Sequence, residues 1–292
     1  MLVTYLIVGA MVTSLVLMQV NLRLGSPLLA IVERWLRWLI LTFGGAQICR
    51  EWNLIDRPYW VLALVFFVAW FLIETLYNWL AISAHSLSSL PLFPRYSVNA
   101  TGEEWPVQPR LLRAREWLRA EGFRQVQALK AEIGSGVFLR VSVYHDAQSL
   151  MRVQVTFIPQ GNGSVSVCYA VTTVTTDGAR YLTDNLHIPF GGFYPENWFV
   201  ERRPWCRSLP RLLARHRARL DRAGMTGVPF TTEPLADFNA VQRELDQINT
   251  ELGFLHPAGK REDLGKFTHE GRYRVWKEIW MLNYLGRSAR YE

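Results

Sequence analysis

Residues 59–82 limit most strongly how this chain can fold, because they form an apolar stretch with a single charge, Glu74. A helix of about 20 apolar residues is needed to cross a hydrocarbon core of about 30 Å. Residues 2–20 form a second stretch of nearly that length, without any charge. No positively charged region precedes it and no small-residue cleavage site follows it, so we expect it to be retained. The two stretches predict a protein integral to the cell membrane.

The segment 27–49, between these stretches, fits two interpretations. Its first half carries Glu33, Arg34 and Arg37, and Glu33 and Arg37 are spaced to pair along a helix. An amphipathic helix in the headgroup layer accommodates these charges. A third span also does so if Arg37 extends its side chain to the membrane surface. The sequence therefore predicts a transmembrane region of two or three spans over residues 1–84.

The number of spans decides on which side the rest of the chain lies. With two spans, the arginine-rich connection between them stays inside and places the C-terminal domain outside. With three, Arg23, Arg34 and Arg37 mark the inner side and the domain is cytoplasmic. Three cysteines without a pairing pattern suit a reducing compartment, so the cytoplasmic side is favoured.

A polar stripe runs along the last part of the stretch 59–82. Glu74, Asn78 and His85 share one helical side. Glu74 lies about 22 Å from the start of the stretch at about 1.5 Å per residue, near the far boundary of the membrane. We expect the stripe to contact protein, with Arg37 or Arg50 as partner. The alternative is an oligomer in which Glu74 lines an ion or proton path.

The remaining chain has the pattern of an α+β domain. Residues 85–108 are rich in Ser and Pro and predict a linker, and the domain occupies 109–292. Apolar and polar residues alternate in several runs between 126 and 183, which predicts an antiparallel meander of four to five strands. A helix is expected over 109–121, and we expect the helices over 208–223 and 234–252 to pack on one face of this sheet, leaving the other face polar.

Charge is concentrated in one part of this domain. Of the 32 Lys and Arg residues, five lie in residues 1–94, together with four of the 25 Asp and Glu residues, so the rest of the chain is basic by six. The densest basic segment is 202–222. Its candidate binding residues are Arg202, Arg203, Arg207, Arg211, Arg215, Arg219 and Arg222.

These arginines fit three kinds of contact. Acidic residues of the next predicted helix can neutralise them, or they can bind anionic lipid or an acidic protein partner. Nucleic acid is the least favoured ligand, because no recognised nucleic-acid-binding module accompanies the arginines.

Catalytic candidates are few. His145 and Asp146 end one predicted strand, and Asp184 and His187 follow another. If those strand ends were neighbours, the four side chains could form a hydrolytic or metal site. Turn and loop chemistry explains them equally well. No phosphate loop, nucleophile elbow, CxxC pair or HExxH motif is found, so no cofactor or metal is predicted.

These observations lead to three hypotheses for function. The first is a membrane protein whose basic domain binds a partner or lipid surface as an adaptor, assembly or regulatory component. The second is a membrane-active oligomer that uses Glu74 and associates through its transmembrane helices, where small residues at 9–14 permit close approach. The third is a membrane-bound hydrolase that uses His145 and Asp184 with their neighbours.

Overall fold

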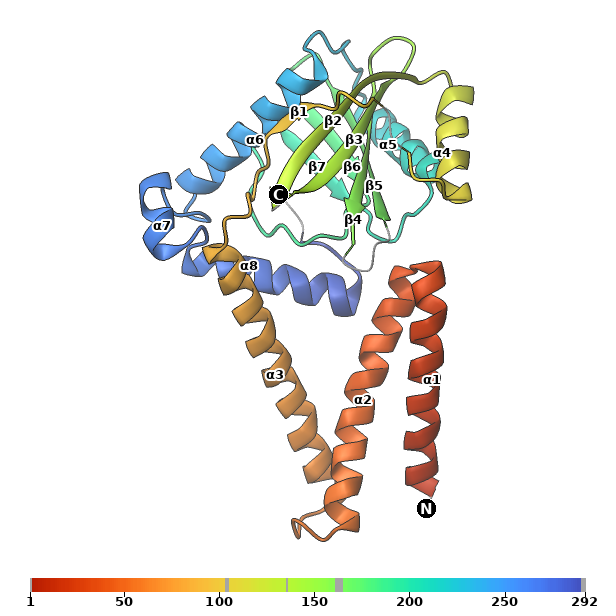
Figure 1. The fold of residues 1–292 in the computed structure, drawn as a ribbon, viewed down its shortest axis with the longest axis vertical. Coiled ribbons are helices and arrows are strands. Elements are labelled where there is room, and N and C mark those ends of the chain that lie inside the picture. Colours follow the sequence, from red (N-terminus) through yellow and green to blue (C-terminus); the bar gives the residue numbers. More distant parts are fainter. Residues whose placement is uncertain (1, 103–104, 135, 161–164, 290–292) are drawn as a thin grey trace. The chain divides into compact units, whose positions relative to one another are not determined.

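The computed structural model describes residues 2–102, 105–134, 136–160 and 165–289, and it divides into two compact units (Figure 1). The helical unit comprises Met1–Ala84, Pro189–Gly191 and Arg272–Ser288. The sheet unit comprises His85–Ile188 and Gly192–Gly271. The predicted combination of apolar N-terminal helices with an α+β architecture is confirmed.

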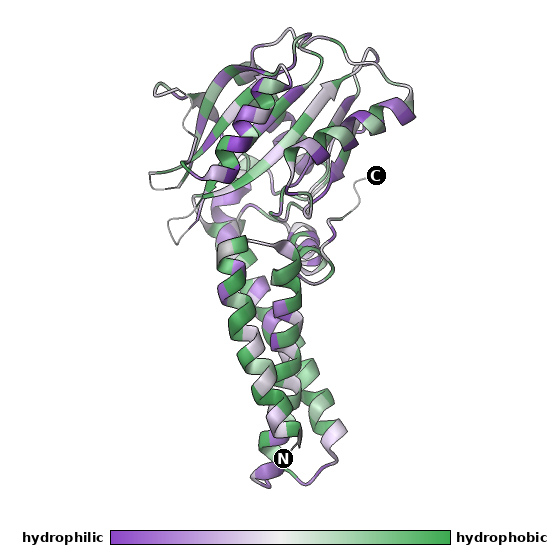
Figure 2. Cartoon of the chain, turned by 90° about the vertical axis from the view of Figure 1, so that its right-hand side faces the viewer, coloured by the Kyte–Doolittle hydropathy of each residue, from purple (hydrophilic) through white to green (hydrophobic). Residues whose placement is uncertain are grey.

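Three helices open the helical unit: α1 (Leu2–Leu24), α2 (Pro27–Glu51) and α3 (Tyr59–Leu87). Two of them, over Val3–Leu22 and Tyr59–Leu87, are long and apolar enough to cross a membrane. Their large apolar side chains point outward; Leu6 on α1 is 65% exposed and Leu76 on α3 is 59% exposed. Figure 2 shows how continuously these helices are apolar. The 25-residue α2 is one unbroken helix. Because of its charged residues, it is less apolar than α1 and α3 and is not one of the two candidate spans.

The three helices alternate in direction. The hydroxyl of Thr4, at the start of α1, donates to Glu51 at the end of α2 over 3.0 Å. Tyr59, at the start of α3, donates to the carbonyl of Phe43 late in α2, over 3.1 Å. Since α2 is antiparallel to both neighbours, α1 and α3 run in the same direction.

Two adjacent glycines make these contacts close. A Cβ on Gly44 would lie 3.7 Å from Ile7 of α1, and a Cβ on Gly45 would lie 2.6 Å from the Phe66 ring of α3. Consecutive residues of a helix point about 100° apart, so the pair serves both neighbours at one level. This Gly-Gly step lets α2 pack between α1 and α3.

The C-terminal segment also belongs to the helical unit. Helix α8 (His269–Trp280) continues into a π-helical turn, η2 (Met281–Leu285). Trp280 lies 5.8 Å from Trp38 of α2 and 5.1 Å from Phe71 of α3, between ring centroids. The sequence prediction assigned 109–292 to one domain. The structure groups Arg272–Ser288 with the N-terminal helices instead, because their aromatic side chains pack together.

The sheet unit is built on seven strands that lie in sequence order. Their bounds are β1 (Tyr96–Val98), β2 (Arg124–Gly134), β3 (Val137–His145), β4 (Arg152–Pro159), β5 (Val165–Val174), β6 (Arg180–Asp184) and β7 (Trp198–Arg202). All neighbours are antiparallel except β6 and β7, which are parallel. The predicted four to five antiparallel strands correspond to β2–β6.

Two strands differ from the sequence prediction. β1 lies inside the predicted linker 85–108 and pairs with β2, and its three residues are too few to show alternation. β7 follows a loop rich in Gly and Pro, over residues 185–197, which returns the chain so that β7 runs parallel to β6. The sheet is therefore mixed, not an antiparallel meander alone.

Helices cover both faces of this sheet. Helices α4 (Pro109–Ala120) and α5 (Leu209–Ala223) share one core with β3–β5, in which Leu118, Val155 and Leu212 are fully buried. Helix α6 (Pro234–Glu251) packs on the opposite face through Phe238, against Val141 and Val143. The short elements η1 (Ala258–Lys260) and α7 (Arg261–Leu264) follow. The prediction that one face stays free of helices is wrong, because α6 takes the second face.

Candidate functional site

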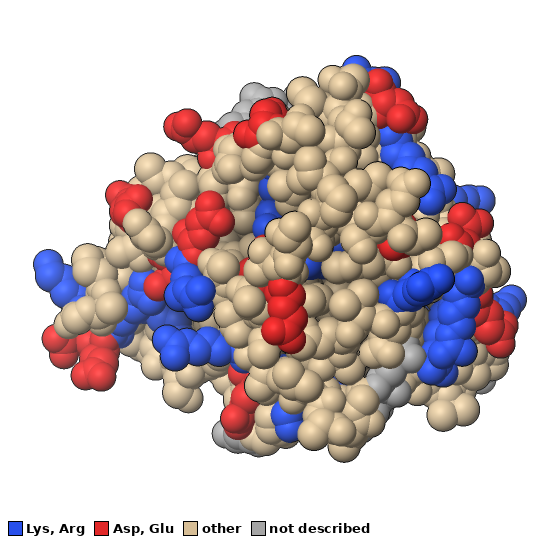
Figure 3. Space-filling model, turned by 90° about the horizontal axis from the view of Figure 1, so that it is seen from above, with Lys and Arg blue, Asp and Glu red and all other residues tan. Residues whose placement is uncertain are grey.

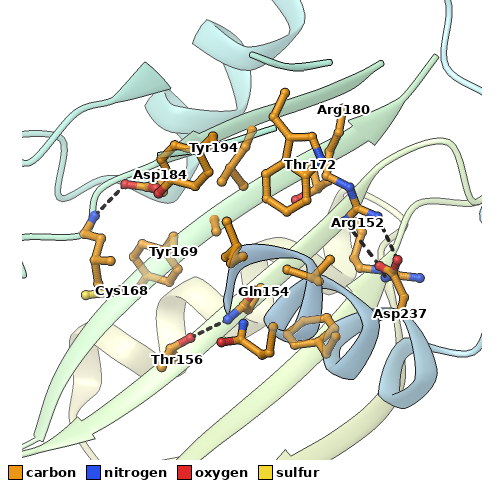
Figure 4. Close-up of a pocket in the computed structure, with 18 of the residues that line it drawn as sticks. Arg152, Gln154, Thr156, Cys168, Tyr169, Thr172, Arg180, Asp184, Tyr194 and Asp237 are labelled. Carbon is orange, nitrogen blue, oxygen red and sulfur yellow. Dashed lines mark hydrogen bonds and ion pairs between the residues drawn. The ribbon is translucent and has the colours of Figure 1, made fainter. Parts of the chain in front are cut away.

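A cavity of about 210 Å³ lies in the sheet unit, between the α6 face of β4–β7 and helix α6 (Figure 4). Helix α6 packs over β1–β3, so the polar part of the same face, further along the sheet, is only partly covered. The loop 185–197 closes another side through Leu186 and Tyr194. The cavity is thus formed where the sheet extends beyond the helix that covers it.

Strand alternation decides which side chains line it. On β4, Arg152, Gln154 and Thr156 face the cavity, and the residues between them face the α4–α5 core. The neighbouring strands add side chains in the same register. They are Cys168, Ala170 and Thr172 from β5 and Arg180, Leu182 and Asp184 from β6.

Two arginines share one carboxylate at one end of the cavity. Asp237 of α6 is ion-paired with Arg152 and, over 2.7 Å, with Arg180. The side chains of Arg152 and Asp237 are only 3% and 13% exposed. The Phe230 ring covers the Arg152 guanidinium, with Cζ 4.0 Å from the ring centroid. Two cations against one carboxylate leave this end with a net positive charge.

His145 contacts the same cluster through a hydrogen bond with Arg152. Its Nε2 accepts a hydrogen bond of 2.9 Å from Nε of Arg152. Burial, and then the charge of Arg152, lowers the pKa of His145 to about 4. The ring is therefore neutral at physiological pH and acts as an acceptor that orients Arg152.

The opposite end of the cavity holds a second ion pair. Arg202 of β7 lies 3.7 Å from Asp184, and both side chains are under 10% exposed. Its Nη2 donates to the Tyr194 hydroxyl over 3.1 Å. Burial and the nearby Asp184 raise the pKa of the Cys168 thiol to about 11, so it stays protonated. Figure 4 shows Asp184 on one side of the cavity and the cluster of Arg152, Arg180 and Asp237 on the other.

The structure does not bring the four catalytic candidates together. Strands β3 and β6 are separated by β4 and β5. The register places His145 at the level of Leu182, so Asp184 lies three strands away across the sheet. Asp146 accepts from the Met151 N–H in a turn. The His187 backbone N–H points to the Cys168 sulfur. A single hydrolytic or metal site would require the two strand ends to be neighbours, and they are not.

The seven arginines of 202–222 also separate. Arg202 faces the cavity, Arg203 and Arg215 pair with Glu201, and Arg219 donates to the Leu182 carbonyl over 2.9 Å. Arg207, Arg211 and Arg222 are exposed. Acidic residues of α6 do not neutralise them, because α5 and α6 cover opposite faces of the sheet. Figure 3 shows basic and acidic side chains intermixed on the face it presents, not one basic patch.

The stripe Glu74–Asn78–His85 has three separate environments. Glu74 accepts a hydrogen bond from the Tyr284 hydroxyl, within the helical unit. Nδ2 of Asn78 is buried without a hydrogen-bond acceptor among the described residues. His85 belongs to the sheet unit, where its carbonyl accepts from Lys266 over 3.0 Å. The described partner of Glu74 is Tyr284, whereas the sequence suggested Arg37 or Arg50; Arg37 pairs with Glu33 instead.

The sequence alone did not indicate Arg152, Arg180 and Asp237, the cluster in which two arginines share one carboxylate. Polar residues alternate along β4, and this pattern predicts that Arg152 lies on a solvated face. One sequence feature does point to this cavity. Polar residues alternate along three neighbouring strands, β4, β5 and β6, so together they form a broad polar area on one face of the sheet.

Comparison with known proteins returns no similarity: no family model, curated protein or solved structure matches this chain. Among the described residues, no three His, Cys, Asp or Glu side chains are grouped to hold a metal ion. Function is therefore inferred from the geometry of the chain itself.

Proposed function

We propose that this protein is an integral membrane protein with three spans, whose sheet unit is a cytoplasmic binding component with a regulatory or adaptor role. The directions of the helices support the three spans. If α1 and α3 both cross the membrane in the same direction, the chain between them has to cross back. Helix α2 is the described helix in that connection, and its 25 residues suffice.

The charges of α2 agree with this placement. Glu33 and Arg37 are paired over 3.3 Å, which lowers the cost of both charges near the membrane. Arg34 and Arg37 lie in the half of α2 that follows the turn after α1, as does Arg23 before it. The positive-inside rule then favours the cytoplasm for that turn, and for the sheet unit that follows α3.

The cavity in the sheet unit carries the proposal of a binding role. Its charged groups are arginines and aspartates already held in ion pairs, and its middle is lined by Ala170, Thr172 and Leu182. Charged groups fixed at two ends of a partly apolar cavity are suited to recognising the polar groups of a small molecule. Two paired, rigid ends favour recognition over proton transfer.

Size and charge narrow the ligand class. A cavity of about 210 Å³ accepts roughly ten non-hydrogen atoms, since about 150 Å³ accommodates benzene. Arg152, Arg180 and Arg202 outnumber Asp184 and Asp237. The ligand that fits is a small organic anion, such as a carboxylate, whose charge lies near Arg152 and Arg180.

The loop 185–197 supports a regulatory role, because it contributes residues both to the cavity and to the helical unit. Tyr194 in this loop lines the cavity, whereas Pro189–Gly191 belong to the helical unit. There the N–H groups of Phe190 and Gly191 both donate to the buried Glu278 of α8. A ligand that repositions Tyr194 acts on a loop whose middle is fixed to the helical unit.

Protein partners and membrane lipid remain part of the proposal. A Cβ on Gly9 would have no described atom within 4 Å, so the small-residue side of α1 is open to a second helix. The exposed Arg207, Arg211 and Arg222 offer contacts for an acidic protein. Nucleic acid is not proposed as a ligand.

Thermal unfolding of the purified full-length protein tests the cavity. Small mono- and dicarboxylates and inorganic phosphate are screened as ligands. Ala170→Phe fills the cavity, and Ala214→Phe, at an exposed position of α5, is the matched control. We expect at least one carboxylate to raise the unfolding midpoint of the parent and of Ala214→Phe but not of Ala170→Phe. An equal rise in all three, or none in the parent, contradicts a ligand cavity.

A reporter fused after residue 292 tests the membrane placement. Activity of a reporter that functions only in the cytoplasm is expected. Activity of a reporter that functions only outside the cell would contradict three spans and support two.

A further inference from the structure

A second pocket lies in the helical unit, where α2, α3 and the C-terminal segment meet. Its volume is about 260 Å³, and Arg34, Arg37, Trp70, Glu74, Tyr77 and Tyr284 line it. None of these residues belongs to the sheet unit. The pocket is therefore independent of the cavity described above.

Arg34 is the exceptional group in this pocket. Its side chain is half-buried, and the described carboxylates Glu74 and Glu33 attract it only through space, without a direct ion pair or hydrogen bond. The other charges are already engaged: Glu33 pairs with Arg37, and Tyr284 donates to Glu74. A cation in a membrane helix that has no anion in direct contact is costly, so a ligand anion is the expected partner.

The depth of Arg34 limits which anion reaches it. Arg34 lies about 25 Å along α2 from Glu51 at about 1.5 Å per residue. In a hydrocarbon core of about 30 Å this is within about 5 Å of the inner boundary, and an arginine side chain extends that far. Phosphates of the inner leaflet lie just beyond that boundary.

The remaining walls suit the same ligand. Trp70 and Tyr77 of α3 line the pocket, and such side chains concentrate at the level of the headgroups. A guanidinium presents several N–H donors to phosphate oxygens, which makes arginine a preferred phosphate ligand. The aromatic rings provide apolar walls for the glycerol part of a lipid.

We infer that this pocket binds the phosphate of an inner-leaflet phospholipid, with Arg34 as its principal ligand and Arg37 beside it. The inference rests on the proposed membrane placement of α2. Its test below measures bound lipid, so it can fail while the reporter still places the sheet unit in the cytoplasm.

The experiment quantifies phospholipid that stays with the full-length protein after purification in mild detergent. Arg34→Gln removes the charge, and Arg34→Lys keeps it with fewer donors. Arg50→Gln, an exposed arginine near the other end of the same helix, is the matched control. We expect the parent and Arg50→Gln to retain phospholipid, Arg34→Gln to retain roughly tenfold less, and Arg34→Lys to lie between them. Equal retention in the parent and Arg34→Gln overturns the inference.

A second measurement separates lipid from free phosphate and does not depend on how a variant folds. Delipidated parent protein is unfolded thermally with inorganic phosphate, short-chain phosphatidylglycerol or short-chain phosphatidylethanolamine. We expect either phospholipid to raise the midpoint and inorganic phosphate not to do so. If inorganic phosphate raises it as much as the phospholipids, the site takes a free anion and the lipid assignment is overturned.

Discussion

The Tyr284 hydroxyl donates a hydrogen bond to the carboxylate of Glu74, joining two residues 210 positions apart. Glu74 is the single charge in the apolar stretch 59–82. Its partner comes from the π-helical turn near the end of the chain, held in place by the indole of Trp35, which donates to the Tyr284 carbonyl over 3.0 Å. The Glu74 carboxylate thus helps to hold the C-terminal segment against α3. This hydrogen bond favours a structural role for Glu74 over a role in a proton path.

Replacing Tyr284 tests that contact. Tyr284→Phe keeps the ring and removes the hydroxyl, so Glu74 loses its donor. We expect a loss of about 1–3 kcal/mol of unfolding free energy, observed as a lower thermal midpoint in detergent. Tyr273→Phe, in an exposed tyrosine of the same segment, should leave the midpoint unchanged. Adding Glu74→Gln to Tyr284→Phe should recover part of the loss, because the unpaired charge is removed; further loss would argue against the contact.

Replacing Gly45 of α2 or Gly9 of α1 by alanine should shift the thermal midpoint in opposite directions. Gly45→Ala brings a methyl to 2.6 Å from the Phe66 ring and should lower the midpoint, since overpacking costs about 1–3 kcal/mol. Gly9→Ala meets no described atom and should raise it slightly, because alanine favours helix. Phe66→Leu in the Gly45→Ala background should restore the packing. A Gly45→Ala protein as stable as the parent would contradict the close approach of α2 and α3.

The fold could be predicted from the sequence where one local pattern decides it. Length and apolarity identify α1 and α3, and period-two alternation identifies β2–β6. Helix α5 ends where Gly224 adopts a left-handed φ of 65°, as a glycine after an amphipathic stretch indicates. These elements are set by residues close together in the chain.

What could not be predicted depends on distant residues. Alternation along β4 places Arg152 and Gln154 on one face but does not say that α6 covers that face. The pairing of Arg152 with Asp237 spans 85 residues, and that of Glu74 with Tyr284 spans 210. Tertiary packing decides both, so the candidate site was visible in the sequence only as separate polar positions.

His216 gives a prediction about pH. It is fully buried on α5, with Nε2 3.0 Å from the Thr173 hydroxyl and Nδ1 2.9 Å from that of Thr183. Burial lowers the pKa of His216 to about 4 from an ordinary value near 6.5. The unfolded chain therefore binds a proton at a pH where the folded protein does not. This contribution to stability is complete above about pH 6.5 and falls by roughly 3 kcal/mol as the pH drops to about 4.

A histidine variant separates this contribution from other acid effects. His216→Gln should lower the thermal midpoint at neutral pH, because its fit between the two threonines is lost. The fall in midpoint between about pH 7 and about pH 5 should be smaller than in the parent. His145, whose pKa is also lowered to about 4, supplies a similar slope that remains in the variant. An unchanged pH dependence in His216→Gln would mean that the buried ring does not govern it.

Asp237 can be replaced by a carboxylate from solution. Asp237→Ala leaves Arg152 and Arg180 without their shared anion in a mostly buried site, which should cost about 3 kcal/mol. Formate or acetate, small enough for the vacated space, should restore part of the thermal midpoint. Asp246→Ala, on the same helix, removes a more exposed pair with Arg261 and should cost less than about 1 kcal/mol. Acetate should not restore Asp246→Ala, since both ions of that pair are solvated. Recovery that is absent in Asp237→Ala, or equal in both variants, would contradict an anion-binding end of the cavity.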